Sequence, residues 1–212
     1  MRRDDSLVPE PGVTEGPELI DAAIASAAIL NGHFALQGGA HGLKFFRFKE
    51  VGRDPQLTRR ISASLVRLAG IVESRDLVVL SPESSGSLLG TALARHLGCP
   101  LALAAIDSRR RPLPFLLTGA LPRRSRVLIA NDVFTTGNSL EPLLAVAGAA
   151  ESEVVGVAVF VALDRARFGE WLETHRLDGR ALVHARWPTY PPGPTCPGCR
   201  AGLPLLPASD FN

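Results

Sequence analysis

The feature that most constrains the fold is an alternation of short apolar runs with helical stretches, which begins at residue 77. Most of these apolar runs have no polar residue at every second position, so the strands they form must be buried on both faces. Helices between such strands make right-handed crossovers and cover the two faces of the sheet. The strands are expected at residues 77–80, 101–106, 127–130, 154–163 and 181–187. This pattern predicts an α/β protein with a doubly wound, mostly parallel sheet.

Helices are expected wherever apolar residues recur at helical spacing. Two boundaries carry local signals, because Asp54-Pro55 is an N-cap followed by proline in the first turn and Gly98 is a C-terminal stop. Glycines followed by closely spaced phenylalanines predict a turn and a short strand or hairpin between residues 32 and 48. The expected helices cover residues 18–30, a stretch from residue 55, residues 87–97, a stretch ending near residue 150, and residues 168–175.

Composition fits one folded domain with short appendages. The 212 residues are 46% hydrophobic and 21% charged, which excludes a collagen-like or wholly disordered chain. The net charge of +2 does not indicate a nucleic-acid partner. Residues 1–17 are polar and predict a flexible N-terminal arm, whereas residues 188–212 hold seven of the 17 prolines and predict an irregular tail. Residues 18–187 then form the α/β domain.

Nothing in the sequence predicts membrane insertion or export. The longest uncharged stretch, residues 22–43, is interrupted by polar residues and glycines. The two N-terminal arginines are not followed by the apolar core of a signal peptide. Three cysteines are too few for a disulfide framework. We therefore expect a cytoplasmic protein.

The turn after residues 127–130 carries the clearest chemical signal. The apolar run ends in Asn131 and Asp132, and a loop of small polar residues leads into a helix. Backbone amides, hydroxyl groups and the positive end of the helix suit a sugar phosphate. The carboxylate of Asp132 lies where it can accept hydrogen bonds from ribose hydroxyl groups or help to position Mg²⁺. The residues of this expected phosphate cradle are Thr135, Thr136, Gly137, Asn138 and Ser139. A purely structural alternative is an ordinary capped helix with Ser139 as its N-cap.

Several segments resemble one known family. VLIANDVFTTGNSL, at residues 127–140, resembles the phosphoribosyl pyrophosphate (PRPP) motif of type I phosphoribosyltransferases. The resemblance covers nearly the whole chain beyond residues 1–17 and indicates the orotate phosphoribosyltransferase branch. The further segments that carry it are GHFALQGGAHG at 32–42, LSPESSG at 80–86, VALDR at 161–165 and CPGC at 196–199.

The resemblance implies that a base nitrogen attacks the anomeric carbon of PRPP and that pyrophosphate is released. It also implies that Mg²⁺ is bound by PRPP together with Asp132. It implies a substrate hood over residues 18–50 and a homodimer that shares its sites. PRPP and a small nitrogenous base, orotate or an orotate-like acceptor, are the expected partners. The pyrophosphate loop would be Glu83, Ser84, Ser85 and Gly86. The base-binding residues would be Gln37, Phe45, Phe46 and Arg165.

Three positions depart from the family pattern. Asn131 replaces the first of two adjacent acids, and Gln37 replaces a lysine that faces the base. The flexible loop that would carry a catalytic lysine has none, because only Lys44 and Lys49 among the 23 basic residues are lysines. Arginine can bind diphosphate bidentately in place of lysine. The arginines that would close over the pyrophosphate are Arg109, Arg110 and Arg111.

These departures leave alternatives open. The fold can serve a non-catalytic PRPP- or nucleotide-binding regulator, or a structural domain with no sugar-phosphate ligand. The motif Cys196-Pro-Gly-Cys199 suits zinc, but a structural zinc site needs four ligands, and Cys99 and the five histidines offer no second pair at zinc spacing. We therefore expect reduced, structural thiols. His33 and His41 flank the glycine-rich loop and are interpreted as surface histidines, with substrate contact by His41 as the alternative.

Overall fold

A seven-stranded sheet forms the centre of the computed structural model, which describes residues 6–26, 28–36, 39–72, 74–83, 85–107 and 112–208. The strand order is β1-β9-β8-β7-β4-β5-β6. The five inner strands are parallel, and the two edge strands pair antiparallel to their neighbours. This confirms the doubly wound, mostly parallel sheet. The strands are β1 (Leu7–Pro9), β4 (Leu77–Pro82), β5 (Leu101–Ile106), β6 (Pro112–Thr118), β7 (Arg126–Phe134), β8 (Glu153–Ala162) and β9 (Gly179–Ala185).

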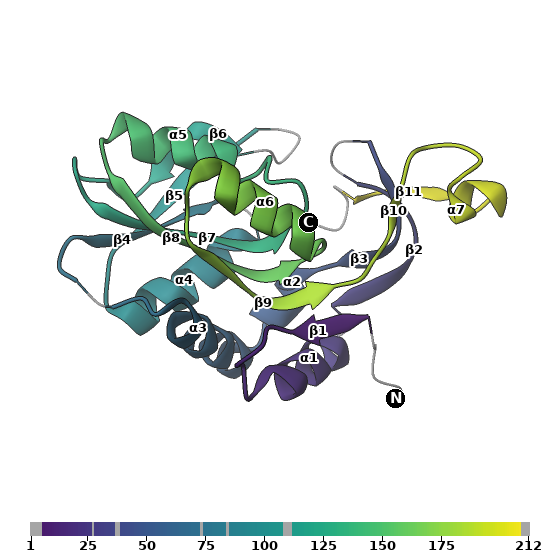
Figure 1. Ribbon diagram of the computed structural model, residues 1–212, viewed down its shortest axis with the longest axis horizontal. Helices are drawn as coiled ribbons and strands as arrows, with labels where there is room; N and C mark the ends of the chain where they lie inside the picture. The colour runs from purple at the N-terminus through teal and green to yellow at the C-terminus, as the bar shows by residue number, and fades with distance from the viewer. Residues whose placement is uncertain are drawn as a thin grey trace.

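Helices cover both faces of this sheet (Figure 1). Successive residues of one strand enter different cores: Leu128 packs with the first face, whereas Ile129 packs with the second. This two-sided burial is why the strands lack a polar alternation. The first face is covered by α1 (Gly16–Ala25), α2 (Phe48–Gly52), α3 (Pro55–Ala69) and α4 (Gly86–Leu97). The second face is covered by α5 (Glu141–Ala149) and α6 (Arg165–His175).

Local signals set several helix boundaries as predicted. The Asp54 carboxylate accepts the backbone N–H groups of Gln56 and Leu57, at 2.8 and 3.1 Å, and so caps α3. Gly98 ends α4 in the left-handed conformation, with φ of 61°. Ser139 is not an N-cap, because α5 begins at Glu141 after Leu140.

A second, four-stranded sheet has the order β10-β3-β2-β11 and joins two distant parts of the chain. The predicted hairpin is confirmed as β2 (Ile29–Ala35) and β3 (His41–Phe46). The tail contributes β10 (Thr189–Tyr190), α7 (Pro197–Arg200) and β11 (Leu205–Pro207). The prediction of an irregular tail was therefore wrong, because β10 and β11 pair with the hairpin through their backbones. The prolines of the tail gave no sign of these strands.

Three other boundaries differ from the predictions. The N-terminal arm is partly a strand, because β1 pairs with β9 at the sheet edge. The helix expected over 18–30 ends at Ala25, since Ile29 already pairs with Phe46 in the hairpin. Strand β6 was not predicted, because its two prolines suggest a loop, although an edge strand tolerates proline. Residues 1–5 of the arm lie outside the described part of the chain.

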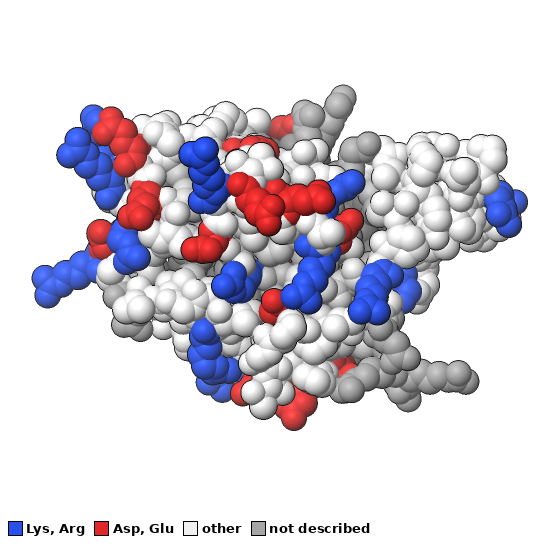
Figure 2. Space-filling model, in the orientation of Figure 1, with Lys and Arg blue, Asp and Glu red and all other residues white. Residues whose placement is uncertain are grey.

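Charged side chains of both signs are interspersed over the main body of the molecule, as Figure 2 shows. The end formed by β11 and α7 is almost free of them on the same face. Arg200 is the only charged residue between positions 188 and 208. Among the helices of the described ranges, none has the length and apolar character needed to cross a membrane.

Candidate functional site

The sheet has its topological switch point between β4 and β7, and open α/β sheets have their ligand crevice outside the carboxyl ends of the strands at such a point. The crossover from β4 leads through α4 to β5 on one side, and the crossover from β7 leads through α5 to β8 on the other. The two connections therefore diverge at the carboxyl ends of these neighbouring strands. The loops after β4 and β7 are the two segments in which the sequence predicted phosphate binding.

Asn131 joins these two loops. It lies near the end of β7, which continues to Phe134 rather than ending at residue 130 as predicted. Its side-chain Nδ2 donates to the hydroxyl of Ser139 at 3.0 Å and to the carbonyl of Val133 at 3.2 Å. Its Oδ1 faces Gly86, where a Cβ atom would lie only 2.5 Å away. The residue at the position of the family's first acid therefore links the predicted phosphate loop to the start of α4.

Asp132 is the buried acid of the crevice, with 8% of its surface exposed. Burial raises the pKa of its carboxyl group. A hydrogen bond from the Ser85 side chain and the positive charge of Lys49 act in the opposite direction and lower the pKa. The fold thus surrounds one carboxylate with a hydroxyl group of the β4 loop and a cation of α2.

Lys49 is a charged neighbour of Asp132 that sequence reasoning did not identify. Its position after the phenylalanines of the hairpin gave no motif to identify it. Only the packing of α2 beside the sheet brings its charge within reach of Asp132. The rarity of lysine in this chain was the one signal that made either lysine notable.

The loop between β7 and α5 has a conformation that requires glycine. Gly137 has φ of 89°, and its carbonyl accepts the N–H of Leu140 at 2.7 Å. A Cβ atom at this position would lie 2.4 Å from Nε1 of Trp171. Trp171 in turn donates to Glu141 at 2.7 Å, which fixes the indole beneath the loop. Thr135, Thr136 and Ser139 are partly buried and Asn138 is exposed, and the segment predicted to bind phosphate forms the turn between β7 and α5.

The predicted pyrophosphate loop is described in part. Ser85 and Gly86 are buried at the beginning of α4, beside Asp132 and Asn131 respectively. Glu83 is exposed, and its backbone N–H donates to the carbonyl of Ala104 at 2.8 Å. Ser84 lies outside the described residues. The beginning of α4 therefore lies beside Asn131 and Asp132, and the Asn131 side chain also contacts Ser139 in the loop that precedes α5.

The predicted base-binding residues do not all lie together. Phe46 is a core residue that packs against Phe160, with ring centroids 5.7 Å apart, so it does not wall a pocket. Phe45 lies on the alternate side of the strand and packs against Phe34, at 5.6 Å. Strand alternation separates these neighbours. Gln37 lies outside the described residues, as do Arg109, Arg110 and Arg111.

Arg165 begins α6 and forms an ion pair with Glu10, at 3.3 Å. The adjacent Asp164 does not pair with it, because Asp164 caps α6 by accepting the N–H of Arg167 at 3.0 Å. The strand end is correctly placed, since the N–H of Leu163 donates to the carbonyl of Phe134 at 2.9 Å. The Arg165 guanidinium is therefore paired with the N-terminal segment at Glu10.

Comparison with known proteins agrees with this geometry. The family described as "Phosphoribosyl transferase domain" matches residues 50–174. An orotate phosphoribosyltransferase of Desulforamulus reducens is 30% identical over 190 residues, covering 89% of this chain and 94% of the relative. One of Chlorobium phaeobacteroides is 31% identical over 191 residues, covering 89% and 93%.

Solved structures show the same fold. The orotate phosphoribosyltransferase of Mycobacterium tuberculosis superposes with a TM-score of 0.62 at 21% identity, covering 80% of this chain and 95% of that one. The UMP synthase of Leishmania donovani gives a TM-score of 0.68 at 20% identity. That match covers 81% of this chain but only 36% of the longer synthase.

Proposed function

Because the chain belongs to the phosphoribosyltransferase family, we propose that it transfers the phosphoribosyl group of PRPP to a nitrogenous base, with orotate as the expected acceptor. One observation carries the proposal. At the topological switch point, the buried carboxylate of Asp132 accepts a hydrogen bond from Ser85 at the beginning of α4, and its neighbour Asn131 contacts Ser139 in the loop before α5. That arrangement suits a ligand with a ribose between two phosphate groups, because each helix end favours an anion and the carboxylate favours hydroxyl groups.

Different residues of the site contact different parts of PRPP in this proposal. The amides and hydroxyls of residues 135–139 bind the 5′-phosphate, and the beginning of α4 at Ser85 and Gly86 receives the pyrophosphate. As the bond to pyrophosphate breaks, positive charge develops on the ribose ring, and the negative charge of Asp132 stabilises it. Asn131 positions both loops through its contacts with Ser139 and Gly86. It brings no charge of its own.

The crevice fits Mg²⁺ that arrives with PRPP. Asp132 offers one carboxylate, and burial raises its pKa, so a divalent cation would stabilise its charged form. Among the described residues, no cluster of acids at the crevice forms a metal site independent of substrate. One carboxylate with ribose and phosphate oxygens is a common magnesium environment. When bound, the ion supplies positive charge to the leaving pyrophosphate.

The test is an assay with Mg²⁺, PRPP and orotate that follows loss of orotate absorbance and release of pyrophosphate. We expect turnover, and a loss of about a hundredfold to a thousandfold in kcat for Asp132→Asn. Gly137→Ala should weaken PRPP binding strongly, because its Cβ would enter the Trp171 ring. Gly148→Ala in α5 is the matched control, because a Cβ there meets nothing within 4 Å.

Asn131 favours a second candidate, a PRPP-binding regulator without catalysis, because it replaces an acid and its Nδ2 is engaged within the protein. Saturable PRPP binding with no turnover on orotate or on a panel of other bases would establish that candidate. Turnover on a different base would keep the enzyme and change its acceptor. Absence of PRPP binding in the folded protein would contradict both. Light scattering tests the expected homodimer.

A further inference from the structure

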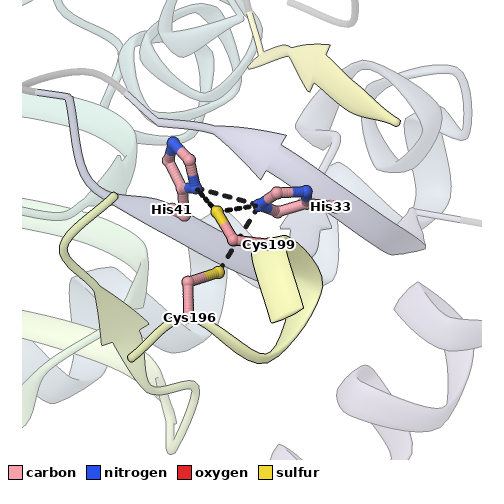
Figure 3. Close-up of side chains that lie close together, drawn as sticks. All are labelled: His33, His41, Cys196 and Cys199. Carbon is pink, nitrogen blue, oxygen red and sulfur yellow. Dashed lines mark hydrogen bonds between the residues drawn. The ribbon is translucent and has the colours of Figure 1, made fainter. Parts of the chain in front are cut away.

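Four potential metal ligands meet at the four-stranded sheet. His33 lies on β2, His41 on β3, Cys196 just before α7 and Cys199 within α7. One ligand atom from each lies within 4.8 Å of all the others, and three of the four residues are buried. Figure 3 shows both imidazole rings and both thiols turned toward a common centre. We propose that this cluster is a structural zinc site that fastens the C-terminal tail to the β2–β3 hairpin.

The distances suit tetrahedral coordination. Zinc–nitrogen bonds of about 2.0–2.1 Å and zinc–sulfur bonds of about 2.3 Å place tetrahedral ligand atoms roughly 3.3–3.8 Å apart. Nε2 of His33 lies 3.4 Å from Sγ of Cys196 and 3.7 Å from Sγ of Cys199. Nδ1 of His41 lies 3.3 Å from Sγ of Cys199. The two ring nitrogens are 2.9 Å apart, so an ion between them requires a small outward movement of one ring.

The surroundings of His33 prepare it as a ligand. Its Nδ1 lies 3.0 Å from the carbonyl oxygen of Leu203. A carbonyl can only accept, so Nδ1 carries the proton and Nε2 presents its lone pair to the cluster. The N–H of Leu203 donates to the carbonyl of Gly198 at 3.0 Å, which holds this partner in place. Histidine ligands of metals usually have such a hydrogen bond on their second nitrogen.

The turn between the cysteines is shaped around the same ring. A Cβ atom on Gly198 would lie 2.5 Å from two ring carbons of His33, so the approach of the imidazole requires glycine here. The N–H of Arg200 donates to the carbonyl of Cys196 at 3.0 Å, and that of Gly202 donates to the carbonyl of Cys199 at 3.1 Å. These bonds close the turn that brings both thiols to one side, as in Cys-x-x-Cys zinc sites.

The tail also needs a form of stabilisation that its other contacts do not supply. Between residues 188 and 208, only Cys196 and Ala208 are buried hydrophobic residues, and neither joins the two hydrophobic cores. Leu203, Leu205 and Leu206 are exposed. Small units with so little apolar burial are usually fastened by disulfides or metal ions. Two thiolates and two neutral imidazoles neutralise Zn²⁺ and leave it no open position, which makes the site structural rather than catalytic.

The prediction that His33 and His41 are surface histidines was wrong, because both are buried beside the two cysteines. Sequence reasoning also found no second ligand pair for these cysteines. It searched for the pair by spacing along the chain. The cysteines lie 158 to 166 residues from the histidines that they meet, and only the pairing of β10 and β11 with the hairpin brings them together.

The test is the metal content of the full-length protein purified in reducing buffer. Elemental analysis should find about one zinc per chain, and the Cys196→Ser/Cys199→Ser protein should hold less than about a tenth of that. Cys99→Ser is the matched control, because Cys99 lies outside the cluster and its loss should leave the zinc content unchanged. Both thiol protons pass to solvent on binding, so affinity for zinc should fall at acidic pH.

A second measurement does not depend on the folding of a variant. Replacement of zinc by Co²⁺ in the unmodified chain should give the intense visible bands of a tetrahedral ion and a sulfur-to-cobalt charge-transfer band. The proposal is overturned if the reduced, folded protein neither contains nor takes up zinc or Co²⁺ stoichiometrically. It is also overturned if mass spectrometry of freshly isolated protein finds Cys196 and Cys199 joined in a disulfide. PRPP binding is measured separately, so failure of one proposal leaves the other standing.

Discussion

The seven-stranded sheet buries apolar side chains on both faces, whereas the four-stranded sheet places two buried imidazoles, one buried thiol and one partly buried thiol between its hairpin and the tail. The first is stabilised by the removal of a large apolar surface from water, which depends little on solution conditions near neutral pH. The second has few buried apolar residues in the half that the tail contributes. Its possible metal ligands lie together in the cluster of two histidines and two cysteines.

This difference separates the two regions by function. The large sheet carries the switch-point crevice and needs a rigid frame for Asp132 and the loops around it. The small sheet ends in the hairpin turn that the family resemblance associates with the base. A region fastened at a single centre can be stabilised or released by the occupancy of that centre alone.

The largest effect is expected in the core of the large sheet. Phe160→Ala removes a buried ring that packs against Phe46 and Phe48, and should cost about 3–5 kcal/mol in the free energy of unfolding. Phe115→Ala, on edge strand β6, should change stability by less than about 0.5 kcal/mol, because that ring is 55% exposed. Denaturant titration of both variants provides the measurement. Similar losses in both would show that burial does not distinguish the core from the edge.

An intermediate, local effect is expected from removal of metal. A zinc chelator should speed hydrogen exchange of the backbone amides that pair β11 with β2 by roughly tenfold or more. Amides between β7 and β8 should exchange as before, because apolar packing holds them. Added zinc should restore the slow exchange. Uniform loosening of both sheets would contradict the separation of the two regions.

The smallest change in stability is expected from replacement of Asp132, at the switch point of the large sheet. Burial raises the pKa of Asp132 in the folded protein above its ordinary value of 3.8, so the folded state holds this proton more tightly than the unfolded chain. Its ionisation therefore reduces stability as pH rises through the interval between these two pKa values, and the loss persists above it. Asp132→Asn should raise the melting temperature at neutral pH by a few degrees, and the gain should vanish near pH 3.8.

Asp76→Asn is the control of opposite sign. A hydrogen bond from Ser74 lowers the pKa of the exposed Asp76 carboxyl group, so its charge favours the folded state at neutral pH. That contribution is lost as pH falls through the folded pKa. The variant should melt slightly lower at neutral pH and equal the unmodified protein in acid. A lower melting temperature for Asp132→Asn at neutral pH would show that its charge stabilises the fold.

Sequence reasoning succeeded where the signal is local. The inner strands, the capped start of α3 at Asp54 and the end of α4 at Gly98 follow from patterns within a few residues. It was less accurate where long-range pairing decides the structure. β1, β10 and β11 are too short to be recognised alone and exist because a partner strand offers them backbone hydrogen bonds.

The amino-acid sequence alone determined the doubly wound sheet and the turn that follows Asp132, because two-sided burial and turn chemistry depend on neighbouring residues. Only the tertiary structure decided that Phe46 belongs to the core, that Arg165 pairs with Glu10, and that the charge of Lys49 helps to lower the pKa of Asp132. It alone also brought His33 and His41 to the two cysteines of the tail. Each of these depends on which distant segments pack together, and spacing along a chain does not encode distance across a fold.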